Sequence, residues 1–106
     1  MRWYGEPCRV EAVPQVDDGL RPMRVVWRDR AAVVAQVVEA PWCEAREWWK
    51  QLGQPATARL HVWFWRVVAV SGVTEQQVAE GRADGPALEL ILREDDGNWW
   101  VEYVVD

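Results

Sequence analysis

Apolar residues alternate with polar ones over short stretches of the chain, and proline and glycine separate these stretches. The stretches are rich in valine and tryptophan, and β-branched and aromatic residues fit the pleated, half-buried surface of a sheet. Strands should therefore dominate the fold. Six are predicted, over Cys8–Val13, Met23–Arg28, Ala31–Glu39, Ala58–Val70, Leu88–Arg93 and Trp99–Val104.

The last two predicted strands form a hairpin whose register follows from its pattern. A two-residue turn at Asp96-Gly97 makes one face of the hairpin wholly apolar, whereas a slip of one residue would mix the faces. This register turns Trp100 away from the core and opposite Arg93, whose guanidinium can lie over the indole ring. The opposed apolar pairs are Leu92 with Val101, Leu90 with Tyr103, and Leu88 with Val105.

Two of the predicted strands, Ala31–Glu39 and Ala58–Val70, are apolar on both alternating faces. A strand of that kind needs cover on both sides. The segment Pro41–Gly53 is the best candidate for this cover, because its apolar residues recur at helical spacing between a proline and a glycine. We therefore expect a short amphipathic helix there.

A second short helix is predicted at Thr74–Glu80, where Thr74 and Gln77 occupy the positions of a capping box. It lies within Ser71–Pro86, a connection too long for an ordinary hairpin. This inserted loop, residues 71–86, is a candidate flap or interaction arm.

Length and composition favour a single domain over residues 1–106, mainly β in an α+β setting. We expect five or six antiparallel strands in a curled or barrel-like sheet, with one or two short helices. The net charge of −5 disfavours a broad phosphate-binding face. No apolar run approaches the roughly 20 residues that span a bilayer, and the first residues lack the apolar core of a signal peptide. A cytoplasmic protein without a membrane contact is expected.

The order of these features resembles a small domain of unknown function over most of the chain, from about Glu6 to Asp106. A similar pattern closes the C-terminal region of ImuB-type proteins, which are catalytically inactive Y-family polymerase relatives of mutagenic translesion synthesis. The resemblance is carried by Arg-, Val- and Trp-rich segments in a fixed order: Arg21–Arg30, a Val-rich strand ending at Trp42, Trp48-Trp49, an aromatic strand from Arg59, Leu88–Leu90 and Trp99–Asp106.

The chain departs from the family pattern at two turns. Ser71–Pro86 is longer than the family's turn between the last strands, and Asp29 stands where the family has a glycine. The resemblance implies a noncatalytic accessory or protein-interaction domain linked to mutagenic repair. Its partner would be a repair polymerase or a recombinase-like protein.

Few residues are suited to catalysis. His61 lies inside a predicted strand between apolar neighbours, and Cys43 would lie near the start of the predicted helix, where thiols tend to be more reactive. Neither has a suitable partner close in sequence, and no catalytic motif is present. Cys8 and Cys43 fit neither a zinc site nor a disulfide framework. We expect no enzyme activity, no cofactor and no metal site.

The nine tryptophans are the strongest functional signal, because each can bury roughly 150–250 Å². Trp27, Trp63, Trp65 and Trp99 are expected in the core. Trp48 and Trp49 are adjacent on the predicted helix, about 100° apart around its axis, so one should lie at the rim of the core.

Tryptophan and arginine are enriched in binding hot spots, and together they predict a partner-binding surface. Its candidate residues are Trp48, Trp49, Trp100, Arg93, Arg46 and Arg59. A protein partner is the first hypothesis. The alternative is single-stranded nucleic acid stacked on the indole rings, which the acidic net charge disfavours.

Overall fold

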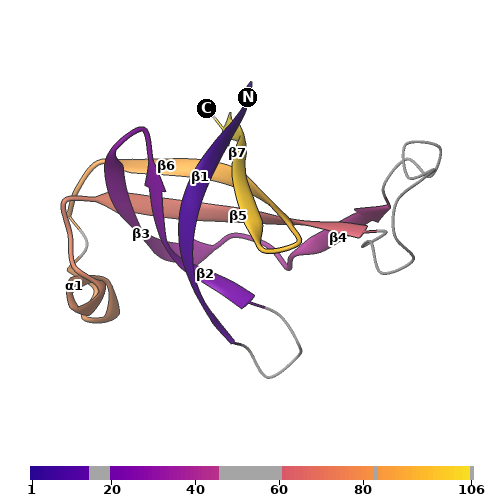
Figure 1. Ribbon diagram of the computed structural model, residues 1–106. Coiled ribbons are helices and arrows are strands. Elements are labelled where there is room, and N and C mark those ends of the chain that lie inside the picture. The colour runs from indigo at the N-terminus through magenta and orange to yellow at the C-terminus, as the bar shows by residue number, and fades with distance from the viewer. Residues whose placement is uncertain (15–19, 46–60, 83, 106) are drawn as a thin grey trace.

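The structure is a computed structural model that describes residues 1–14, 20–45, 61–82 and 84–105. These residues form seven strands and one short helix (Figure 1). Their bounds are β1 Arg2–Pro14, β2 Leu20–Trp27, β3 Arg30–Val37, β4 Trp42–Ala45, β5 His61–Ser71, α1 Glu75–Ala79, β6 Ala87–Asp95 and β7 Asn98–Val105.

Six of the strands close into an antiparallel barrel. Their order around it is β3-β2-β1-β7-β6-β5, and pairing of β5 with β3 completes the ring. The strand β4 is added to the free side of β5. The first and last strands lie side by side, with the labelled chain ends close together (Figure 1). The expected mainly β, barrel-like architecture and its six predicted strands are confirmed.

The prediction of a helix at Pro41–Gly53 is wrong at its start, because Trp42–Ala45 forms the strand β4. This strand pairs with the first residues of β5, which extend past β3 and would otherwise leave one side of their backbone unpaired. The Trp42 ring stacks on Phe64, with 5.6 Å between the centroids, and this cross-strand contact favours the strand. Residues 46–53 lie outside the described residues.

The shorter predicted helix is confirmed as α1. The Thr74 hydroxyl accepts a hydrogen bond from the Gln77 backbone N–H at 3.1 Å, and the Gln77 side chain accepts one from the Thr74 backbone N–H at 2.9 Å. The helix contacts β3 on the outside of the barrel. There Val33 and its partner Val70 are buried although they are separate from the main core cluster. No helix of the described part of the chain is long and apolar enough to cross a membrane.

The last hairpin keeps the predicted register only beside its turn. Farther along, an extra residue at Glu102 forms a β-bulge, so Leu90 pairs with Val104 rather than with Tyr103. The bulge brings Val104 into the core, where it is 6% exposed, and turns Tyr103 to the outer face. The pairs that are as predicted are Arg93 with Trp100 and Leu92 with Val101.

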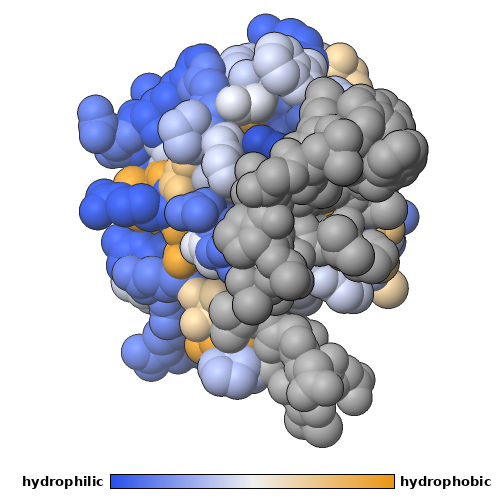
Figure 2. Space-filling view, turned by 45° about the vertical axis from the view of Figure 1, so that its right-hand side comes forward, coloured by the Kyte–Doolittle hydropathy of each residue, from blue (hydrophilic) through white to orange (hydrophobic). Residues whose placement is uncertain are grey.

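The core fills the interior of the barrel. Trp65 and Trp99 belong to it as predicted, and Trp27 packs at its margin. Trp63 was expected there but is 40% exposed, because it lies where β5 extends beyond its pairing with β3. On the face drawn in Figure 2, hydrophobic residues show only as small groups among hydrophilic ones. The buried cluster consists of Val25, Val34, Trp65, Val67, Ala69, Leu90, Leu92, Trp99, Val101 and Val104.

Candidate functional site

A row of aromatic side chains, interrupted by one arginine and ended by a proline, crosses the outer wall of the sheet. We call it the aromatic row. Its residues come from five strands, and each neighbouring pair is in direct backbone register. Side chains in such register lie close enough to contact one another. In order from β4 to β1, the row consists of Trp42, Phe64, Arg93, Trp100 and Pro7.

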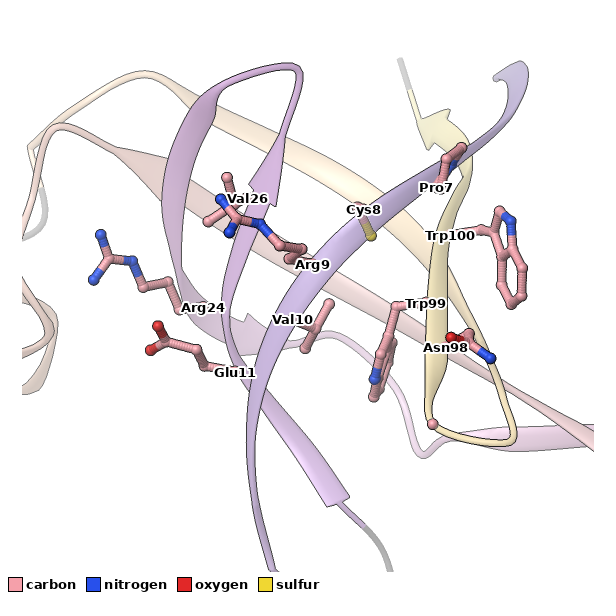
Figure 3. A pocket seen from close by; sticks show the side chains of 11 residues that line it. Pro7, Cys8, Arg9, Val10, Glu11, Arg24, Val26, Asn98, Trp99 and Trp100 are labelled. Carbon is pink, nitrogen blue, oxygen red and sulfur yellow. The ribbon is translucent and has the colours of Figure 1, made fainter.

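Arg93 and Trp100 form the centre of the row. They face outward because their chain neighbours Leu92 and Trp99 face the core, and Figure 3 shows Trp99 and Trp100 on opposite sides of β7. The guanidinium carbon of Arg93 lies 4.3 Å from the centroid of the Trp100 ring. A cation–π contact of this kind contributes about 0.5–1 kcal/mol at a partly exposed site. The stacking expected from the sequence is confirmed.

Glu102 holds Arg93 from the other side. Its Oε2 lies 3.1 Å from Arg93 Nε in an ionic contact, although the two atoms are out of hydrogen-bond alignment. Its Oε1 accepts a hydrogen bond from the Trp3 indole N–H at 3.2 Å. Because Glu102 is the extra residue of the bulge, it can reach both neighbours.

Trp3 is the most exposed tryptophan among the described residues, at 66%. Its ring lies over Gly5, where an added Cβ would come within 2.5 Å of the ring. Gly5 also has a positive φ of 59°. Both features require glycine at this position. The Trp3 ring is therefore positioned by its close approach to Gly5 and by its hydrogen bond to Glu102.

A second row lies beside the first on the same wall. Ile91 is only 7% exposed although it faces outward, because its neighbours in the row shield it. Arg66 in this row donates a hydrogen bond to Glu89 and forms an ion pair with it. The arginines of these two rows, Arg93 and Arg66, therefore each have a glutamate partner. The second row consists of Arg66, Ile91, Tyr103 and Trp3.

The structure brings together two of the six predicted binding residues, Arg93 and Trp100. The other four, Arg46, Trp48, Trp49 and Arg59, lie outside the described residues. Residues of the two rows that were not predicted as site residues include Trp3, Trp42, Phe64 and Pro7. Alternation within each strand marks their faces, but only the strand order and register join them into one surface.

Of the residues considered for catalysis, Cys43 takes a different place from the one expected. Cys43 is exposed in the strand β4 rather than at a helix start. His61 begins β5, and its side chain is not described. Burial raises the pKa of the Cys8 thiol to about 11. In the described part of the chain, no three His, Cys, Asp or Glu side chains gather in a way that could hold a metal ion.

A groove of about 760 Å³ adjoins the end of the aromatic row (Figure 3). Pro7 and Trp100 border both features, so the groove continues the row across β1. Charged side chains from β1 and β2 line its other side: Arg9, Glu11 and Arg24. An extended surface results, with aromatic rings at one end and charges of both signs at the other.

Comparison with known proteins identifies the family. A family model described as a domain of unknown function, DUF6504, matches residues 1–106. Searches of curated proteins and of solved structures each found no match.

Proposed function

We propose that this chain, which belongs to the family Domain of unknown function (DUF6504), is a noncatalytic module that binds a protein partner through the aromatic row. The observation that supports this function is the direct register of Trp42, Phe64, Arg93 and Trp100 on the outer wall. The buried core cluster lies on the other face of β5, β6 and β7, so the outward side chains of these strands are not part of the core.

The chemistry of the row suits a protein interface. Tryptophan, tyrosine and arginine supply a large share of binding energy where they are close together and partly buried already. The contacts of Arg93 with Trp100 and Glu102 fix its side chain before binding, which lowers the entropy lost on association. The mixed charges of the adjoining groove would add specificity rather than affinity.

A nucleic-acid partner is less well supported. Single strands are bound by aromatic rings together with basic side chains that contact phosphates. On this wall Arg93 lies against Glu102 and Arg66 against Glu89, so the carboxylates offset the positive charge. The net charge of −5 acts in the same direction.

The partner that we propose is a polymerase-like or recombinase-like protein of mutagenic translesion repair. Support for this finer proposal comes from the likeness of the sequence pattern to the end of ImuB-type proteins. It is separate from the proposal of a protein-binding surface, and the experiment below has a distinct outcome for each.

The test is site-specific photocrosslinking in the native host. A benzoylphenylalanine placed at Tyr103, in the second row, should crosslink one defined protein, which is then purified and its affinity measured by calorimetry. Truncation of a hot-spot residue costs about 2 kcal/mol or more, so Trp100→Ala should weaken binding roughly thirtyfold. Its melting temperature should stay close to that of the wild type.

A crosslinker at Gln36, exposed on β3 away from the row, is the matched control. Equal crosslinking from Gln36, or a second copy of this chain as the captured protein, would contradict the proposed surface. Capture of a metabolic enzyme would support the protein-binding function but contradict the proposed link to repair. Salt-sensitive binding of labelled oligo-dT that Trp100→Ala abolishes would favour nucleic acid instead.

A further inference from the structure

One end of the barrel opens into a cavity of about 610 Å³ that the proposed function does not use. All six barrel strands contribute residues to its lining. Its volume lies within the roughly 300–1,000 Å³ of small-molecule sites, and the mouths of β-barrels are common places for such sites. We call this cavity the barrel mouth.

The inner part of the barrel mouth is aliphatic. Four core residues line it, each no more than 6% exposed: Val25, Ala69, Leu90 and Val104. Above them Leu88 faces the same cavity and is 47% exposed. An apolar ligand body would cover Leu88 and remove this side chain from water.

The rim has the opposite character. Its charged residues are Arg2, Arg28 and Arg30, and no Asp or Glu is among the residues that line the barrel mouth. Arg28 is already paired with the carboxylate of Glu6, so Arg30 is the rim arginine that would meet an anion. An anion at the rim would be attracted, and arginine binds carboxylates through paired N–H donors.

The aromatic part of the wall is held in place by Arg28. Its guanidinium carbon lies 5.0 Å from the Tyr4 ring centroid and 4.8 Å from that of Trp27. Arg28 Nε also donates to Glu6 at 2.8 Å, and the Trp27 indole N–H donates to the same carboxylate at 3.0 Å. Both rings therefore have fixed positions beside the cavity before any ligand enters.

From this arrangement we propose that the barrel mouth binds a small amphipathic carboxylate. Its apolar body would lie against Ala69 and Leu90, and its carboxylate would accept hydrogen bonds from arginine at the rim. The polarity of the cavity, aliphatic inside and cationic outside, is what selects an anion with an apolar body over a neutral or cationic analogue. The site is independent of the aromatic row.

The test uses three probes with one chain length and different heads: octanoate, 1-octanol and octylammonium. Each is titrated into the ¹⁵N-labelled protein, and amide and indole N–H signals are followed by NMR. Octanoate should shift the Trp27 indole and the amides of Ala32 and Leu90, leave the Trp100 indole unmoved, and bind at least tenfold more tightly than the other probes, roughly the value of one charged hydrogen bond.

Arg30→Gln should raise the Kd of octanoate about tenfold and leave that of 1-octanol unchanged. Arg9→Gln, an exposed arginine outside the barrel mouth, is the matched control and should bind octanoate like the wild type. Ala32→Phe, which places a ring in the cavity, should abolish binding. Equal affinity for all three probes, an unaltered Kd in Arg30→Gln, shifts at Trp100 in place of Trp27, or no shifts would each overturn the proposal.

Discussion

Arg28 has a left-handed backbone with φ of 52°, a conformation that costs energy in a residue with a long side chain. Asp29, the next residue, has φ of 61°, so the pair forms the two-residue turn between β2 and β3. The contacts of Arg28 with Glu6, Tyr4 and Trp27 offset that cost. A glycine would suit the backbone better here, but it would lose all three contacts.

The pair of Glu6 and Arg28 should make stability depend on acid pH. The hydrogen bond from Arg28, helped by that from Trp27 and by the charge of Arg28, lowers the pKa of Glu6 from its ordinary 4.5. Because the folded pKa is lowered, the stabilisation is complete above about pH 4.5 and is lost as pH falls through the folded pKa. Glu6→Gln should therefore lower the urea midpoint at pH 7 and change it much less at pH 2.5. An equal loss at both pH values would show that the charge of Glu6 is not involved.

The two cysteines should differ in reactivity. Burial raises the pKa of Cys8 to about 11 from 9.0, which reduces its thiolate fraction at pH 8 roughly a hundredfold. Cys43 is exposed. With Ellman's reagent in native buffer, one thiol per chain should react quickly, and Cys43→Ser should remove that fast phase. Cys8→Ser should leave it intact, and a fast phase that depends on Cys8 would contradict the packing of β1.

At the scale of elements, the six barrel strands could be predicted, because runs of valine and aromatic residues between Pro and Gly usually form strands. The capping pair of Thr74 and Gln77 was equally local, and α1 follows from it. The strand β4 could not be predicted, because four residues after a proline carry too little periodicity. Its strand conformation depends on the overhanging end of β5, which is remote in sequence.

The bulge at Glu102 could not be predicted either, because it also depends on a strand that is remote in sequence. Strict alternation predicted that Tyr103 faces the core, but the bulge turns it outward. The partner strand β1 has an irregularity of its own at Gly5, and the two irregularities face each other. The contact of Arg93 with Trp100 was predictable because it lies next to the turn. The rest of the aromatic row was not, since joining Trp42 to Pro7 needs the order of five strands.

Position along β6 should decide how much a leucine contributes to stability. Leu92 and Leu88 share one face of the strand, yet Leu92 is fully buried and Leu88 is 47% exposed at the barrel mouth. Leu92→Ala should lower the free energy of unfolding by about 2–5 kcal/mol, because it leaves a cavity in a core that cannot collapse. The matched Leu88→Ala should cost about 1 kcal/mol or less. Urea unfolding measures both, and similar losses would contradict the depth assigned to these residues.

At the scale of the whole molecule, closure explains how strands that are apolar on both faces are covered in the described part of the chain. The barrel buries one face of every strand, and on the other face the outer rows shield one another. When β4 is left aside, each barrel strand pairs with the next barrel strand along the chain. The one remaining pairing, the seam between β1 and β7, closes the barrel. That seam joins the two ends of the chain, with Arg2 opposite Val104.

A circular permutant tests this closure. Joining residues 106 and 1 by a short flexible linker turns β1 and β7 into a hairpin, and opening the chain between Gly81 and Arg82 breaks no strand pairing, since both residues are exposed in the connection from β5 to β6. The permutant should keep the β-sheet circular dichroism spectrum and one cooperative thermal transition, because all six seams can still form. Opening instead between Ile91 and Leu92 interrupts β6 in the core and should prevent folding. Failure of the permutant opened between Gly81 and Arg82 to fold would contradict the closing seam between β1 and β7, and folding of the permutant opened in β6 would contradict the place of that strand in the core.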